Sequence, residues 1–287
     1  MNKITIGIIG FGMVGRAIHH GFAQTADFRI YDVNPKISEN TLEEVVEDSD
    51  FIFICVPTPM KKDTGECDIS ILDDTFKKIK NIGNYHHITE HKYEKKIYII
   101  KSTIPPYTTE ELQQKYPMRI VFNPEFLTAR TSKLDFINSS RIILGGDKED
   151  VDKVEELYRM RFPATPIFKT DTKTAELAKY TANCFFATKL SFFNEIHQVC
   201  DKLDIDYNEL IKLVISDNRI GNSHYTVPGQ DGDYGFGGLC FPKDLNSLIY
   251  KEKELGVKPT VLEAVWKKNL EVRKKYDWLK IKGAVSS

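Results

Sequence analysis

The strongest constraint on the fold is the order of signals between Ile4 and Asp32. An apolar, β-branched run over Ile4–Ile9 leads directly into the glycine turn GFGMVG, which is followed by the helical pattern RAIHHGFA and by a second apolar run ending at Asp32. This order is typical of a βαβ unit, in which the glycines allow a tight turn, close approach of a pyrophosphate and packing of helix against strand. We therefore expect a dinucleotide to bind here.

The aspartate that ends the second run indicates which dinucleotide binds. A carboxylate at this place accepts hydrogen bonds from the ribose hydroxyls and repels a 2′-phosphate, so Asp32 predicts NAD rather than NADP. The alternative is an ordinary strand-to-helix turn with a loop aspartate, but the strand, helix and next strand all stand in their expected places. The cofactor-binding residues predicted in this region are Gly10, Gly12, Met13, Val14, Gly15 and Asp32.

Apolar runs separated by segments of helix length continue through the first half of the chain. They span residues 4–9, 28–31, 51–56, 97–100, 120–122 and 142–144. This alternation predicts an α/β fold with a doubly wound parallel sheet of the Rossmann type. The sequence TLEE at residues 41–44 is a capping box that opens one of the helices.

Polar, proline-containing turns follow three of these runs: VPTP after residue 55, KSTIPP after residue 100 and NPE after residue 122. The prolines could simply end the strands. Ligands of doubly wound sheets, however, bind beyond the carboxyl ends of the strands, where these turns are expected to meet. Three such turns in succession favour the lining of a cleft.

The second half begins with a long helical pattern over residues 171–203, with a cap expected at Asp171 or Thr172. Steps of three and four residues place Lys179 and Asn183 at the head of an otherwise apolar face that continues through residues 186, 190 and 193. Lys179 could extend its amine to solvent. If buried, both polar side chains need partners, because burial of an unpaired polar group costs several kcal/mol.

The overall composition limits the function classes. The 40 Lys and Arg residues balance 41 Asp and Glu residues, so the charge favours a small-molecule partner over nucleic acid. Five cysteines without CxxC spacing argue against a disulfide framework or a zinc site and fit a cytoplasmic protein. We see no signal peptide or membrane-spanning run. His86, His87 and His91 could bind a metal, but their polar surroundings indicate a surface insertion, so we expect no metal site.

Cys240 stands apart from the other cysteines. It follows three glycines in GFGGLCFPKD, inside a loop long enough to be functional, and helical periodicity begins just after it. A helix N-terminus and nearby Lys243 both favour the thiolate form. Cys55, Cys184 and Cys200 lie in apolar strand or helix patterns and are expected to be small buried hydrophobes.

Taken together, these features of the chain resemble the UDP-glucose and GDP-mannose dehydrogenase family. The resemblance runs from the first strand to about Lys275 and is carried by the NAD turn and the motifs CVPTP, KSTIPP, FNPEFL, AELAKYTAN and GFGGLCFPKD. Members of this family oxidise the C6 alcohol of a nucleotide sugar to a carboxylate, reduce two NAD molecules and use the cysteine as nucleophile. The segment VPGQDG is nearer to the UDP-glucose types.

The resemblance implies specific roles for residues of this chain. The implied catalytic residues are Cys240 as nucleophile and Lys179 and Asn183 as oxyanion stabilisers. Asp244, Glu125 and Thr103 are implied to hold or activate the hydrolytic water. Which of them is the principal base is left open. The further implied cofactor-binding residues are Val56, Pro57, Thr58, Ser102, Thr103 and Lys243. The implied substrate-binding residues are Glu125, Phe126, Leu127, Lys179, Asn183, Tyr225, Gly235, Phe236 and Gly237, with Gly238 also in the family's pocket pattern.

Two departures from the family pattern are visible. Ala129 stands where a second glutamate is usual, which predicts some loss of water activation. Family members also continue into a third, nucleotide-binding-like domain, so we expect a more open pocket and weaker or altered substrate binding, unless a partner chain supplies the lid.

The resemblance implies an NAD-dependent nucleotide-sugar 6-dehydrogenase that acts on UDP-glucose. The alternatives are a two-electron dehydrogenase of the 3-hydroxyacid or 6-phosphogluconate type and a non-catalytic NAD-binding regulatory subunit. We expect an NAD-binding domain over residues 1–170 and a helical domain over residues 171–287. The long helix carries phenylalanines at 185, 186, 192 and 193, on more than one face, which predicts a homodimer.

Overall fold

The computed structural model describes residues 3–85 and 96–286, so His86, His87 and His91 lie outside the described residues. The chain divides into two compact units. The first comprises Met1–Thr58 and Ile69–Lys179, and the second comprises Pro59–Asp68 and Tyr180–Ser287.

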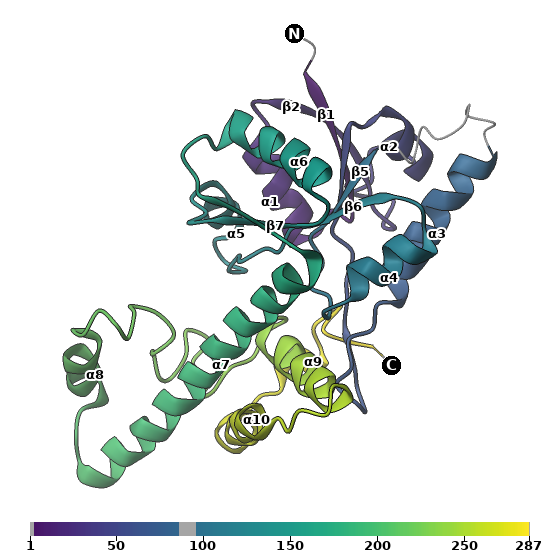
Figure 1. The fold of residues 1–287 in the computed structure, drawn as a ribbon. Coiled ribbons are helices and arrows are strands. Elements are labelled where there is room, and N and C mark those ends of the chain that lie inside the picture. The colour runs from purple at the N-terminus through teal and green to yellow at the C-terminus, as the bar shows by residue number, and fades with distance from the viewer. Residues whose placement is uncertain (1–2, 86–95, 287) are drawn as a thin grey trace. The chain divides into compact units, whose positions relative to one another are not determined.

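The first unit is built on a seven-stranded sheet with the strand order β2-β1-β3-β5-β6-β7-β8 (Figure 1). The strands are β1 (Ile4–Ile9), β2 (Ala26–Tyr31), β3 (Phe51–Ile54), β5 (Ile97–Ile100), β6 (Arg119–Phe122), β7 (Ile142–Gly145) and β8 (Ile167–Thr170). The chain order reverses on either side of β1, which confirms the predicted α/β, doubly wound architecture.

Helices cover both faces of this sheet (Figure 1). One face carries α1 (Met13–Phe22), α5 (Ser132–Ile137) and α6 (Lys148–Arg161). The other carries α2 (Leu42–Asp48), α3 (Ser70–Tyr85) and α4 (Thr108–Lys115). Because both faces are buried, the central strands can be apolar along their whole length, as the sequence indicates.

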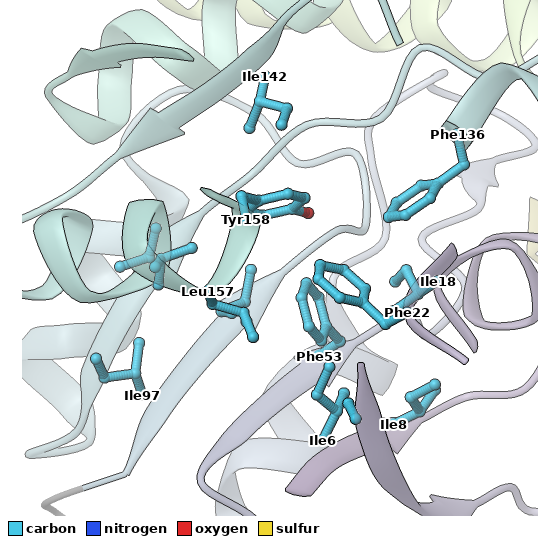
Figure 2. Packing of buried hydrophobic residues seen from close by; sticks show 14 of the residues in the cluster. Ile6, Ile8, Ile18, Phe22, Phe53, Ile97, Phe136, Ile142, Leu157 and Tyr158 are labelled. Carbon is cyan, nitrogen blue, oxygen red and sulfur yellow. The ribbon is translucent and has the colours of Figure 1, made fainter. Parts of the chain in front are cut away.

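An aromatic cluster fills the layer between the sheet and α1, α5 and α6 (Figure 2). The ring of Phe22 lies 6.3 Å from Phe53, 6.0 Å from Phe136 and 5.5 Å from Tyr158, measured between ring centroids. The Phe53 ring is tilted against Phe22, whereas Phe136 and Tyr158 meet it edge to face. Edge-to-face rings at these separations add to the stability gained by burying their apolar area.

The sheet differs from the sequence prediction in two respects. Its last strand, β8, was not predicted, because the sequence IFKT is only partly buried at the sheet edge and lacks a clear apolar run. In addition, β7 runs antiparallel to β6, with Phe122 opposite Gly145, whereas β7 and β8 are parallel. The direction of a strand depends on the path of its connection, which hydrophobic periodicity does not report.

Two predicted helix starts are confirmed. The Thr41 hydroxyl accepts from the Glu44 N–H at 3.2 Å, and the Glu44 carboxylate accepts from the Thr41 N–H at 2.9 Å, which completes the capping box of α2. The long helix α7 spans Thr172–Leu203, and the Asp171 carboxylate caps it by accepting from the Thr174 N–H at 2.9 Å.

The second unit is helical, with one small addition. Besides the larger part of α7 it contains α8 (Tyr207–Ile215), α9 (Phe241–Glu254), α10 (Thr260–Val272) and the short helix η1 (Asp277–Leu279). Two short parallel strands, β4 (Met60–Lys61) and β9 (Val285–Ser286), join the segment that follows β3 in the sequence to the end of the described chain.

A buried carboxylate from α7 closes the N-terminus of α4 within the first unit. Glu176 accepts hydrogen bonds from the backbone N–H groups of Tyr107 and Thr109, both at 2.8 Å, and from the Thr109 hydroxyl at 2.6 Å. Burial nevertheless raises the pKa of Glu176 to about 7, although these hydrogen bonds act in the opposite direction.

The raised pKa predicts a pH-dependent stability. Folded Glu176 binds its proton more tightly than Glu176 in the unfolded chain does. Its stabilising contribution to the free energy of unfolding should therefore be complete below about pH 4.5 and be lost as the pH rises to about 7. The loss should reach up to about 3 kcal/mol. Glu176→Gln should flatten the dependence of the unfolding free energy on pH in this window. Urea unfolding at closely spaced pH values measures the slopes. Glu111→Gln, on the exposed side of α4, is the matched control, and equal slopes for all three proteins would contradict the assignment.

Candidate active site

The glycine turn has the geometry that a dinucleotide requires. Gly10 has a φ of +95°, and a Cβ there would lie 2.6 Å from the Cys55 carbonyl oxygen. A Cβ on Gly15 would lie 2.3 Å from the Gly10 carbonyl oxygen, whereas a Cβ on Gly12 would meet nothing within 4 Å. Gly10 and Gly15 are thus required for the turn and its packing. Gly12 leaves open space at the N-terminus of α1, which an anion can approach.

Asp32 lies beside this turn at the end of β2. Its carboxylate accepts from the Phe11 N–H at 2.7 Å, which ties the second strand to the glycine turn. A hollow of about 890 Å³ opens here and is lined by Tyr31, Asp32, Val33, Pro35, Ser38, Asn40, Thr41, Leu42, Glu43, Lys78, Asn81 and Ile82. This volume lies within the range of ligand-binding pockets, and the predicted ribose ligand Asp32 is part of the lining.

The turns after β3 and β5 meet, as predicted. The Thr58 hydroxyl donates to the Thr103 carbonyl oxygen at 2.7 Å, and the Ser102 hydroxyl donates to the Val56 carbonyl oxygen at 2.6 Å. Thr58, Ser102 and Thr103 are buried. These contacts fix two polar loops at the carboxyl edge of the sheet.

Lys179 and Glu125 form a buried ion pair within the first unit. The Lys179 amine lies 2.9 Å from a Glu125 carboxylate oxygen, and the two side chains are only 3% and 7% exposed. The alternative of a lysine that reaches solvent is therefore wrong. Burial acts to raise the pKa of Glu125, but Lys179, the Leu127 N–H and Lys101 together outweigh it, so the pKa is lowered and the group is a carboxylate at neutral pH.

Asn183, one turn further along α7, has its partner in the second unit. Its amide donates to the Asp244 carboxylate at 2.5 Å, and the other oxygen of that carboxylate accepts from Lys243 at 2.5 Å. Burial acts to lower the pKa of Lys243, but Asp244, Cys67 and Cys240 outweigh it, so the pKa is raised and the lysine stays charged. Both predicted polar residues of α7 are thus buried and paired.

Cys240 is the N-cap residue of α9 and is half-buried. Its carbonyl oxygen accepts from the Asp244 N–H at 2.8 Å, which closes the first turn of the helix. Cys184 and Cys200 are buried, as expected for structural cysteines, whereas Cys55, also expected to be buried, is only partly so. The position predicted for Cys240, at the start of a helix beside a lysine, is confirmed.

Comparison with known proteins agrees with this geometry. Residues 31–161 match the NAD binding domain of the UDP-glucose/GDP-mannose dehydrogenase family, and residues 173–271 match the central domain of the same family. The chain belongs to this family. Its cofactor is NAD, bound by the first of these domains.

Named members of the family are 30% to 34% identical to the chain over the aligned residues. UDP-glucose 6-dehydrogenase TuaD of Bacillus subtilis is 34% identical over 242 residues, which are 82% of this chain and 49% of that protein. GDP-mannose 6-dehydrogenase of Pseudomonas aeruginosa is 30% identical over 249 residues, 82% of this chain and 54% of that protein. The chain therefore spans about half the length of the curated relatives it matches.

Solved structures of the same fold support the assignment. A UDP-glucose dehydrogenase from Pyrobaculum islandicum matches with a TM-score of 0.82 and 26% identity, over 94% of this chain and 68% of that one. A 3-hydroxyisobutyrate dehydrogenase from Mycobacterium tuberculosis matches with a TM-score of 0.71 at 14% identity over 94% of both chains, which shows a shared fold only.

Lys101 and Asn123 belong to two of the predicted cleft turns, but the sequence indicates no individual role for either residue. The Lys101 amine donates to the Asn123 side-chain oxygen at 2.9 Å and to the Pro124 carbonyl oxygen at 3.3 Å, and thereby holds the loop that carries Glu125. Burial lowers the pKa of Lys101 to about 8, against the influence of Glu125 and Cys55. The sequence feature that could have indicated this buried role is the position of Lys101 directly after the fully apolar strand β5.

The other predicted binding residues have varied surroundings. The Phe126 ring has the Arg141 guanidinium 4.4 Å and the Lys179 amine 5.4 Å from its centroid. The Tyr225 hydroxyl donates to Asn222 at 2.7 Å. Phe236 is 3% exposed, and its ring packs in the core of the second unit. Ala129, at the position of the usual second glutamate, is exposed.

Two kinds of feature are absent from the described residues. Over residues 3–85 and 96–286, no three His, Cys, Asp or Glu side chains gather as a metal site would require. Among the helices of that same part of the chain, none has the length and apolar character needed to cross a membrane.

Proposed function

We propose that the chain takes part in the NAD-dependent four-electron oxidation of the C6 alcohol of a nucleotide sugar to a carboxylate, with UDP-glucose as the substrate. The observation that carries this proposal is the half-buried thiol of Cys240 at the N-cap of α9, four residues before a buried carboxylate that is paired with Lys243 and Asn183. A two-electron dehydrogenase of the same fold needs no such thiol.

The cysteine divides the oxidation into two manageable stages. The glycine turn and Asp32 would hold NAD, which would supply the hydride acceptor for each stage. After the alcohol has become an aldehyde, the Cys240 sulfur forms a bond to C6 and gives a thiohemiacetal, which becomes a thioester on loss of the second hydride. Water then breaks the C–S bond, which releases the carboxylate and restores the thiol. Covalent capture keeps the aldehyde from escaping.

The paired polar groups are proposed to stabilise the charges that develop at C6. Lys179 and Asn183 are donors one turn apart on α7, suited to stabilise the oxyanions of the thiohemiacetal and of the hydrolysis step. Glu125 is ionised at neutral pH because its pKa is lowered, so it can accept a proton from the attacking water. Asp244 and Thr103 are the further groups proposed to hold that water.

The choice of UDP-glucose rests on the relatives. Bacillus subtilis TuaD is named a UDP-glucose 6-dehydrogenase, and the Pyrobaculum islandicum structure is that of a UDP-glucose dehydrogenase. The GDP-mannose 6-dehydrogenase of Pseudomonas aeruginosa is somewhat less similar. UDP-glucose is therefore the first substrate to test, and GDP-mannose the second.

Counting reduced cofactor per sugar consumed tests the proposal. Purified chain should form two NADH per UDP-glucose, together with one carboxylate. One NADH per sugar would indicate a two-electron dehydrogenase. No turnover with UDP-glucose, GDP-mannose or N-acetylated UDP-hexosamines, combined with measurable NAD binding, would favour a regulatory subunit.

We further propose that the chain forms a homodimer through an apolar stripe on α7. Phe185, Phe192 and Val199 are 61%, 57% and 47% exposed, and their spacing of seven residues places them along one side of the helix. Three large apolar side chains in a row at this exposure are typical of a subunit interface. A second copy, with the same stripe, is the partner that matches it.

The dimer proposal predicts a change of mass in solution. Replacing both Phe185 and Phe192 by Asp should convert the dimer to a monomer in light scattering after size exclusion, because each charge would have to be buried at the interface. Val261→Asp, at a 65% exposed position on α10, is the control and should leave the mass unchanged. A monomeric unmodified chain would contradict the proposal.

A further inference from the structure

The loop that carries Cys240 is held by an asparagine from α10. Asn269 is fully buried, its side-chain oxygen accepts from the Phe236 N–H at 2.7 Å, and its amide donates to the Phe236 carbonyl oxygen at 3.0 Å. One side chain thus satisfies both backbone groups of a single loop residue. This is a demanding geometry, since the donor and the acceptor must both face the loop.

Arg273, one turn further, ties both ends of the same loop. Arg273 is 5% exposed, and its guanidinium donates to the Asp231 carboxylate at 2.7 Å and to the Asp277 carboxylate at 3.0 Å. The other oxygen of Asp277 accepts from the Gly238 N–H at 3.0 Å. Asn269, Arg273 and Asp277 together form a loop clamp, which holds the loop through Phe236, Gly238 and Asp231.

The loop clamp explains two of the glycines before Cys240. A Cβ on Gly235 would lie 2.2 Å from the Asn269 side-chain oxygen, and a Cβ on Gly237 would lie 2.1 Å from an Arg273 nitrogen. Side chains of the protein itself therefore occupy the space that these glycines leave. Gly238 is different, because a Cβ there would meet nothing within 4 Å.

We propose that Asn269 is a positioning residue for Cys240, acting with Arg273 and Asp277. Fixing the backbone from Gly235 to Gly238 fixes where the chain enters α9, and Cys240 is the N-cap of that helix. A displacement of about 1 Å at a reacting group can cost about 100-fold in rate, so a clamp on this loop affects the chemistry without touching the substrate. The inference rests on the proposed function of Cys240.

Asn269→Asp tests the positioning role with little change of shape. It keeps the oxygen that accepts from Phe236 but sets a second oxygen against the Phe236 carbonyl, so the loop loses one hydrogen bond and gains a repulsion. With UDP-glucose as the substrate, we expect kcat to fall by about 100-fold. The KM for NAD should be unchanged, because the glycine turn belongs to the first unit. Asn208→Asp, the same exchange at an exposed position of α8, should change neither constant.

Two further measurements keep the test decisive. Asp277→Ala removes the acceptor of the Gly238 N–H from a side chain that is 39% exposed, so it should fold even if Asn269→Asp does not, and should lower kcat by about tenfold. Alkylation of Cys240 by iodoacetamide, followed by peptide mapping with the buried Cys200 as internal reference, reports the thiol independently of turnover.

The outcomes separate this inference from the proposed function. If the chain oxidises no nucleotide sugar, a Cys240 alkylation rate that changes in Asn269→Asp and Asp277→Ala, but not in Asn208→Asp, still supports the clamp. A lowered unfolding temperature with kcat and Cys240 alkylation both unchanged would reduce Asn269 to a structural residue and overturn the inference.

Discussion

Replacing Cys240 by serine should lower the rate of carboxylate formation by at least about 1,000-fold, because a serine hydroxyl is a far weaker nucleophile than a thiolate at neutral pH. The first oxidation does not involve the sulfur, so the variant should still produce aldehyde and one NADH per sugar. An aldehyde trap such as hydroxylamine, followed by mass spectrometry of the product, detects this species. The signature is therefore a change in stoichiometry as well as in rate.

The matched control is Cys200→Ser, the same atomic change at a buried cysteine in the apolar cluster of α7 and α8. It should retain two NADH per sugar and lose some thermal stability. Two NADH per sugar from Cys240→Ser, at the rate of the unmodified chain, would contradict the covalent mechanism. Loss of both oxidation steps would instead indicate that Cys240 supports substrate binding.

Local signals in the sequence were sufficient for the cofactor turn and for the place of the thiol. Gly15 and Asp32 are determined by contacts within one βαβ unit, and Cys240 is determined by the start of its own helix. Such features depend on residues that are close in the chain, so their spacing carries the information.

The partners of the buried groups were less accessible from sequence. The helical face containing Lys179 and Asn183 shows that partners are needed, but Glu125 lies 54 residues away and Asp244 lies 61 residues away. The sequence gives even less indication that Asn269 and Arg273 are buried and paired, because a single asparagine or arginine on a surface helix normally faces solvent. Their role becomes visible only when the glycine loop is seen against α10.

Replacing Lys179 by methionine should have a large effect on both stability and turnover. It leaves the 7% exposed Glu125 carboxylate without its main counter-charge, a loss that costs about 3 to 5 kcal/mol for a buried pair. The pKa of Glu125 should rise, because Lys179 is the strongest influence that lowers it. Removal of an oxyanion donor should lower kcat by about 100- to 1,000-fold. Urea unfolding and steady-state kinetics measure the two effects on the same preparation.

A second substitution separates the two effects of Lys179→Met. Adding Glu125→Gln removes the buried charge that methionine leaves behind, so the double variant should recover most of the lost free energy of unfolding. Turnover should not recover, because the double variant lacks both the proposed ammonium donor and the proposed carboxylate base. If the double variant regains activity in parallel with stability, Lys179 serves only to neutralise Glu125, and oxyanion stabilisation at C6 must be assigned to Asn183 alone.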